Sequence, residues 1–115
     1  MITLENEWLT VDIHPKGAEL QRLYRKDLSL NYLWKGDPAF WAKHAPLLFP
    51  IVGELKDNTY YYEGKTYHLP RHGFARDKEF EFATHNSQEA LFTLQDDPGS
   101  LKIYPFAFLL EVHYS

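Results

Sequence analysis

Short runs of aromatic and β-branched residues, separated by turn residues, recur along the whole chain and constrain its fold more than any other feature. The clearest example is YYYEGKTYHL, in which Glu63-Gly64 separates two tyrosine-rich runs and predicts a two-residue hairpin turn. In HPKGAEL, Pro15 ends one run and Gly17 supplies the flexible backbone before the next. Helix signals are weak throughout. We therefore predict a nearly all-β chain of antiparallel strands.

Period-two patterning gives approximate bounds for each strand. The predicted strands are 2–5, 7–14, 18–25, 30–34, 58–62, 65–69, 79–85, 90–95 and 106–114. We interpret DDPG (96–99) as a turn that closes a strand. The stretch DPAFWAKHAP (37–46) is short and ends at a proline, so we expect a turn of helix or a loop there.

Composition narrows the class of protein. At 115 residues, with 44% hydrophobic and 17% aromatic residues, the chain has material for one packed domain. The chain has a net charge of -4, and its basic and acidic residues are mixed, with no run of lysine and arginine. This pattern disfavours nucleic acid and anionic membranes as partners. No cysteine is present, so disulfides and thiolate metal sites are excluded. The N-terminus does not resemble a signal peptide, and no window approaches ~18 uninterrupted apolar residues. We expect a soluble, cytoplasmic protein.

The end of the sequence is unusual for a complete domain. The apolar run YPFAFLLEVHYS reaches Ser115 with no turn or polar tail after it. Either this strand pairs with another part of the chain, or the sequence is the front part of a longer protein. We favour the second explanation, and expect residues 1–115 to be the N-terminal part of a single domain.

One loop combines residues that can carry chemistry. In LPRHGFARDKEFEF, His72 precedes a glycine that lets backbone approach a ligand, and Arg76 and Asp77 follow closely. Such a loop can present an imidazole to a concave surface. Equally, it can be a surface loop with an Arg-Asp ion pair. The other five histidines have no partner at metal-ligand spacing, and we expect structural roles for them.

Four motifs together carry a family resemblance. LLFPIVG (47–53), YYYEGKTYHLP (60–70), HGFARD (72–77) and YPFAFLLEVHYS (104–115) resemble the aldose 1-epimerase, or galactose mutarotase-like, family. The nearest branch looks like that of LacX proteins and hexose-6-phosphate mutarotases. The resemblance implies an antiparallel β-sandwich, a supersandwich, that holds a sugar in a groove. Family members are more than twice this long, so the chain resembles only their N-terminal portion.

The resemblance also implies a reaction. The family interconverts the α and β anomers of an aldose by general acid-base ring opening and closure, without a cofactor. By position, His72 matches the first family histidine, and Arg76 and Asp77 are expected to bind substrate. The family's general-acid histidine and general-base glutamate lie further along its chains, so Glu111 and His113 are not assigned these roles. Whether this chain is itself an enzyme stays open.

Three further expectations concern ligands. Glu54 follows FPIVG, where many relatives carry a basic residue, and it would repel the phosphate of a phosphorylated hexose. In a non-catalytic carbohydrate-binding module, Trp34, Trp41 and Phe74 would stack on a sugar; alternatively these aromatics pack in the core. Exposed strand edges can also promote self-association.

Overall fold

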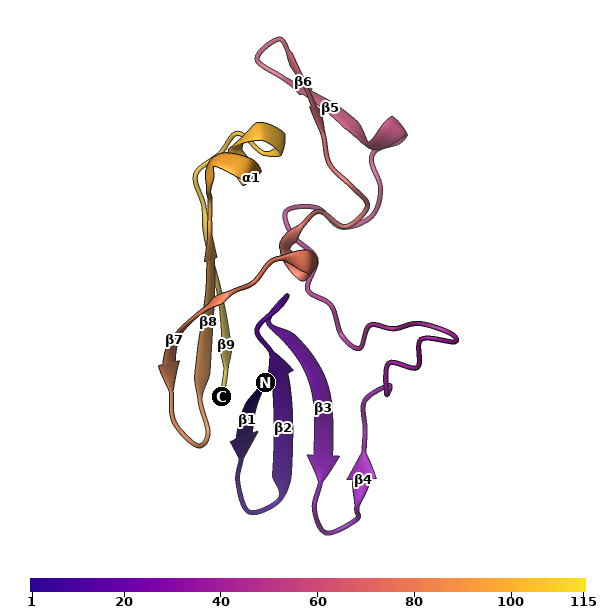
Figure 1. Ribbon diagram of the computed structural model, residues 1–115, viewed down its shortest axis with the longest axis vertical. Coiled ribbons are helices and arrows are strands. Elements are labelled where there is room, and N and C mark those ends of the chain that lie inside the picture. Colours follow the sequence, from indigo (N-terminus) through magenta and orange to yellow (C-terminus); the bar gives the residue numbers. More distant parts are fainter.

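The computed structural model describes the backbone of residues 1–115 and all side chains except those of Thr84 and His85. Across this backbone the chain forms three antiparallel sheets, as Figure 1 shows. The first contains β1 (Ile2–Glu5), β2 (Leu9–His14), β3 (Glu19–Arg25) and β4 (Leu30–Asn31) in that order. The second pairs β5 (Thr59–Tyr62) with β6 (Lys65–His68), and the third pairs β7 (Glu81–His85), β8 (Ala90–Gln95) and β9 (Leu109–Tyr114). The nearly all-β prediction is confirmed.

Strand positions agree with the sequence pattern, and the differences lie at strand ends. β4 ends at Asn31, three residues before the predicted end. The Asn31 side-chain oxygen accepts hydrogen bonds from the backbone N–H groups of Leu23 and Leu33, at 3.1 and 3.2 Å. An asparagine that bonds neighbouring backbone in this way favours a turn over a continuing strand. β9 likewise begins three residues later than predicted, at Leu109.

The β5–β6 hairpin turns at Glu63-Gly64, as predicted. Tyr62 pairs with Lys65, which leaves a two-residue turn. Glu63 has a φ of 47° and Gly64 a φ of 74°. Positive φ at both central positions is what a type I′ turn requires, and this turn matches the right-handed twist of the flanking strands.

The prediction that DDPG forms only a turn is wrong. A short helix, α1 (Pro98–Ile103), begins within this motif. The Asp97 side chain accepts a hydrogen bond from the Ser100 N–H at 2.7 Å, and the Ser100 hydroxyl accepts one from the Asp97 N–H at 2.9 Å. This is a capping box, with Pro98 in the first helical turn where a missing N–H costs nothing. Turn chemistry and helix-start chemistry use the same residues here.

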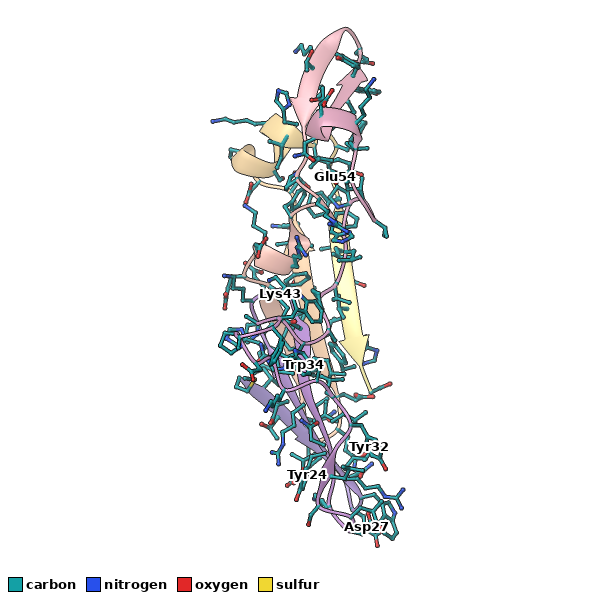
Figure 2. The ribbon with its side chains drawn as sticks, turned by 90° about the vertical axis from the view of Figure 1, so that its right-hand side faces the viewer. Tyr24, Asp27, Tyr32, Trp34, Lys43 and Glu54 are labelled. Carbon is teal, nitrogen blue, oxygen red and sulfur yellow. The ribbon has the colours of Figure 1, made fainter. Side chains whose placement is uncertain are left out.

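The molecule is an open slab with a small core. Its extents are 57 × 34 × 16 Å, and Figure 2 shows it edge-on. The radius of gyration is 16.6 Å, whereas a compact domain of this length has one of about 13 Å. The accessible surface is 7497 Å², against about 6,600 Å² for a compact protein of this mass. The core cluster is Leu4, Ile13, Ala18, Ala75, Phe80, Ala90 and Phe92.

Large apolar side chains lie on the surface of the slab as a result. Those at least half exposed include Trp8, Leu28, Tyr32, Phe40, Val52, Tyr61 and Leu109. In the part of the chain that the structure describes, no helix is long and apolar enough to cross a membrane.

Candidate functional site

Two segments that flank the β5–β6 hairpin meet side by side in the middle of the slab (Figure 1). Phe49 and Gly73 form a parallel bridge between them. The Phe49 carbonyl accepts hydrogen bonds from the N–H groups of Phe74 and Ala75, at 2.9 and 3.2 Å. A Cβ at Gly73 would collide with the Phe49 carbonyl, and the Gly73 φ is +72°. Only glycine fits this close backbone approach without strain.

His72 is tied to the first segment by a reciprocal pair of hydrogen bonds. Its backbone N–H donates to the Gly53 carbonyl at 2.8 Å. The Gly53 N–H donates in turn to Nδ1 of the His72 ring, also at 2.8 Å. His72 has a φ of 63°, a left-handed conformation that is uncommon for histidine. No local sequence pattern signals this contact, since the two residues lie 19 positions apart.

A 3-10 turn, η2 (Ala75–Asp77), holds Arg76 next to His72. The β2–β3 turn packs against it: the Gly17 N–H donates to the Lys78 carbonyl at 2.7 Å, and a Cβ at Gly17 would lie 2.7 Å from the Arg76 carbonyl. Arg76 Nη2 donates to the Arg71 carbonyl at 3.2 Å. Arg76 Nε is buried and has no hydrogen-bond partner among the described residues. The guanidinium is therefore held in place with donor capacity left over.

The two predicted residues His72 and Arg76 line the same hollow. This hollow has a volume of about 600 Å³ and is lined by Trp41, Pro46, Leu48, Arg71, His72 and Arg76. Sequence reasoning missed Arg71, although its position directly before His72 was a signal. Asp77, also predicted to bind substrate, is not among the lining residues. Its carboxylate faces Lys43 instead, at 3.4 Å, and not Arg76 as a surface Arg-Asp pair would require.

The loop 35–46 supplies the aromatic wall of the hollow. Glu19 is buried, and its Oε1 accepts hydrogen bonds from the backbone N–H groups of His44 and Ala45, at 2.7 and 3.0 Å. Trp34 Nε1 donates to the Trp41 carbonyl at 2.8 Å. These bonds fix a loop without regular helix and place Trp41, half exposed, at the hollow. Trp34 is exposed but does not line it.

Phe74 belongs to the core and not to the ligand surface. It is 5% exposed and packs against the rings of Phe49, Tyr104 and Phe108 with centroid separations of 5.9–6.3 Å. Burying an aromatic of this size stabilises a fold by several kcal/mol. Phe74 thus anchors the loop that carries His72 and Arg76.

The polar side chains that line the hollow share one property among the described residues: each is a hydrogen-bond donor. Arg71 and Arg76 donate through guanidinium groups, and Trp41 through its indole N–H. Glu54 is exposed and does not line the hollow; Figure 2 places it toward the β5–β6 end of the slab, away from Lys43 and Trp34. No group of three His, Asp or Glu side chains that could hold a metal ion occurs among the residues described.

Comparison with known proteins gives consistent relatives. Residues 1–115 match the family described as aldose 1-epimerase. The chain is 36% identical to the plasmid-encoded protein LacX of Lactococcus lactis subsp. lactis, over 99% of this chain and 40% of that protein. The solved structure of a galactose mutarotase related enzyme from Lactobacillus acidophilus superposes with a TM-score of 0.97 at 43% identity, over 99% of this chain and 38% of that one.

A second solved structure agrees. A galactose mutarotase-like protein from Lactobacillus casei ATCC 334 superposes with a TM-score of 0.95 at 40% identity, covering 99% of this chain and 39% of that one. The chain thus spans about two fifths of the length of these relatives. Its fold is that of the matching part of galactose mutarotase-like structures, and its match to the family extends from the first residue to the last. The chain belongs to the aldose 1-epimerase family.

Proposed function

We propose that these residues form one wall of the active site of an aldose 1-epimerase that interconverts the α and β anomers of a hexose. The observation that carries the proposal is the hollow that His72 shares with Arg71, Arg76 and Trp41. A hollow of this size, with a few convergent polar groups and an aromatic wall, suits a small polar ligand such as a sugar. Family membership supplies the reaction class.

The reaction requires two proton transfers. A base removes the proton from the anomeric hydroxyl while an acid delivers a proton to the ring oxygen, and the ring opens to the free aldehyde. Rotation about the C1–C2 bond and the reverse transfers close the ring on the other face. The donor groups of this wall suit the ring-oxygen side of the sugar. The acceptor for the anomeric proton is not among the side chains that line this wall.

A phosphorylated hexose is a second candidate substrate. No carboxylate of a described side chain lies within ion-pair distance of Arg71 or Arg76. Both guanidinium groups are therefore available to bind an anionic ligand. The repulsion expected from Glu54 is weakened, because that side chain does not line the hollow. Comparing a hexose with its 6-phosphate as substrates separates the two candidates: a preference for the neutral hexose would favour the first.

The proposal is tested by polarimetry on a protein of the relatives' full length that carries these 115 residues. His72→Ala should lower the rate of anomerisation by about 10²–10⁴-fold, the usual contribution of a proton-transfer group. His68→Ala is the matched control, because His68 is exposed on β6 and lies outside the hollow. Equal rates of anomerisation in the two variants would show that His72 has only a structural role.

A non-catalytic carbohydrate-binding module remains the alternative, and Trp41 supports it by presenting an exposed aromatic surface in the hollow. Sugar binding without any acceleration of anomerisation in the full-length protein would favour this alternative. We further propose a cytoplasmic location, since a chain without cysteine forms no disulfides and so needs no oxidising compartment.

A further inference from the structure

The hydrogen bond from Gly53 to His72 has a fixed direction. A backbone N–H is always a donor, so Nδ1 of His72 must be the acceptor in the 2.8 Å contact between them. An imidazole nitrogen accepts only when it carries no proton. In the neutral ring the single proton then resides on Nε2.

We propose that Gly53 is a positioning residue that locks His72 as the Nε2–H tautomer, so that the ring acts in the hollow as a hydrogen-bond donor and not as a proton acceptor. The lock itself stands on the geometry of the chain alone. Its consequence for a sugar rests on the proposed function.

Several contacts hold the ring in this orientation. The reverse bond, from the His72 N–H to the Gly53 carbonyl, fixes the backbone at a φ of 63°. The next residue is fixed as well, because the Gly73 N–H donates to the Pro70 carbonyl at 2.9 Å and Phe49 blocks any movement of Gly73 toward it. An uncommon backbone conformation persists only where its surroundings impose it, and such positions cluster at functional sites.

The lock decides what His72 can do. Protonating Nδ1 would set an N–H against the Gly53 N–H and break the bond between them, whereas Nε2 has no protein partner among the described residues and remains available to a ligand. Nε2–H must therefore meet an acceptor atom, such as a ring or hydroxyl oxygen. With Arg71 and Arg76 beside it, the polar side chains of the wall present donors, and they suit a ligand edge that offers acceptor atoms.

Two other histidines in the same chain serve as internal references. Nδ1 of His44 lies 2.9 Å from the Trp34 carbonyl, which can only accept, so His44 must carry its proton on Nδ1. Nδ1 of His14 accepts from the Lys16 N–H at 3.0 Å, so His14 must be the Nε2–H tautomer like His72. One spectrum should therefore show both tautomers.

The test is long-range ¹H–¹⁵N NMR of the uniformly ¹⁵N-labelled chain, and of the protein of full length, at mildly alkaline pH. We expect an unprotonated Nδ1 in His72 and a scalar coupling between that nitrogen and the Gly53 amide nitrogen. The coupling is essential, because Nε2–H also predominates in free histidine. His44 in its Nδ1–H form shows that the sample is folded. In such a sample, an Nδ1–H form of His72 or the absence of the coupling would overturn the proposal.

A pair of variants tests the role of each nitrogen. In His72→Asn the side-chain oxygen can replace Nδ1 as acceptor, and asparagine tolerates the left-handed backbone; the Gly53 amide should keep its protection from hydrogen exchange. In His72→Gln the amide can replace Nε2–H but not Nδ1, so this protection should fall at least tenfold. Loss of Gly53 protection in the Asn variant alone would contradict the lock.

The same pair connects the lock with activity. In the full-length protein, His72→Gln should retain more anomerisation activity than His72→Asn, because only Gln can supply a donor at the position of Nε2. A greater activity of His72→Asn would refute the donor role. If the coupling to Gly53 is observed while His72→Ala remains fully active, the lock stands and the proposed function fails.

Discussion

We expect Gly73→Ala to destabilise the fold by disrupting the contact between the two site segments. The new methyl group would meet the Phe49 carbonyl, and the residue would keep a φ of +72°. A left-handed conformation costs a non-glycine residue about 1–2 kcal/mol. Moving Phe49 away would also weaken the two hydrogen bonds that its carbonyl accepts, at about 0.5–1.5 kcal/mol each. The free energy of unfolding should therefore fall by about 2–5 kcal/mol.

Gly64→Ala provides a matched control for the collision. Gly64 has a nearly identical φ of +74°, but a Cβ there would have no atom within 4 Å. Gly64→Ala should therefore lower the free energy of unfolding only by the strain of the left-handed backbone, about 1–2 kcal/mol. Urea unfolding of both variants in the full-length protein, followed by tryptophan fluorescence, measures the difference. Equal losses in the two variants would refute the argument; a Gly73→Ala chain that cannot fold while Gly64→Ala folds would support it.

Two more predictions concern Tyr114 and the isolated chain. Burial raises the pKa of Tyr114 above its ordinary value of 10.0, and its hydroxyl donates to the Ala18 carbonyl at 2.7 Å. Because the fold favours the neutral phenol, this contribution is complete below the unfolded-state pKa and is lost as pH rises through the folded-state pKa. Tyr114→Phe should cost about 0.5–1.5 kcal/mol at neutral pH and flatten the alkaline loss in urea unfolding; an unchanged alkaline slope would contradict this. The isolated 115-residue chain should self-associate through its exposed apolar faces and leave sugar anomerisation at the uncatalysed rate; a monomer by size-exclusion chromatography that matches the full-length rate by polarimetry would contradict both expectations.

Local chemistry explains why the strands could be predicted. Period-two patterning located each of them, and Glu63-Gly64 fixed one turn type and register. The error at DDPG has an equally local cause: Asp97-Pro98 can begin either a turn or a helix. The capping bonds with Ser100 decide between them, and they become visible only in three dimensions.

The site could be predicted only in part. His72 and Arg76 could be predicted as members of one site because they lie four residues apart in one loop. Trp41 was considered only as one of three stacking aromatics. The loop that carries it is fixed by bonds from His44 and Ala45 to Glu19 on β3, which lies about 25 residues earlier in the chain. The Gly53 contact is a long-range bond between main chain and ring, and no residue type signals it.

The position of the β5–β6 hairpin between the two site segments bears on the order in which the chain folds. Hairpins of this kind form within microseconds from local contacts. The backbone bond from Leu69 to Asn58, at 2.9 Å, extends the ladder close to the site. Once this ladder exists, the loop that separates Gly53 from His72 is less than half its former length, which lowers the free-energy cost of closing it by about 0.7 kcal/mol. We therefore expect the tyrosine-rich ladder to form first, and the His72 ring to reach the Gly53 amide roughly threefold faster than it would across the full loop without the hairpin.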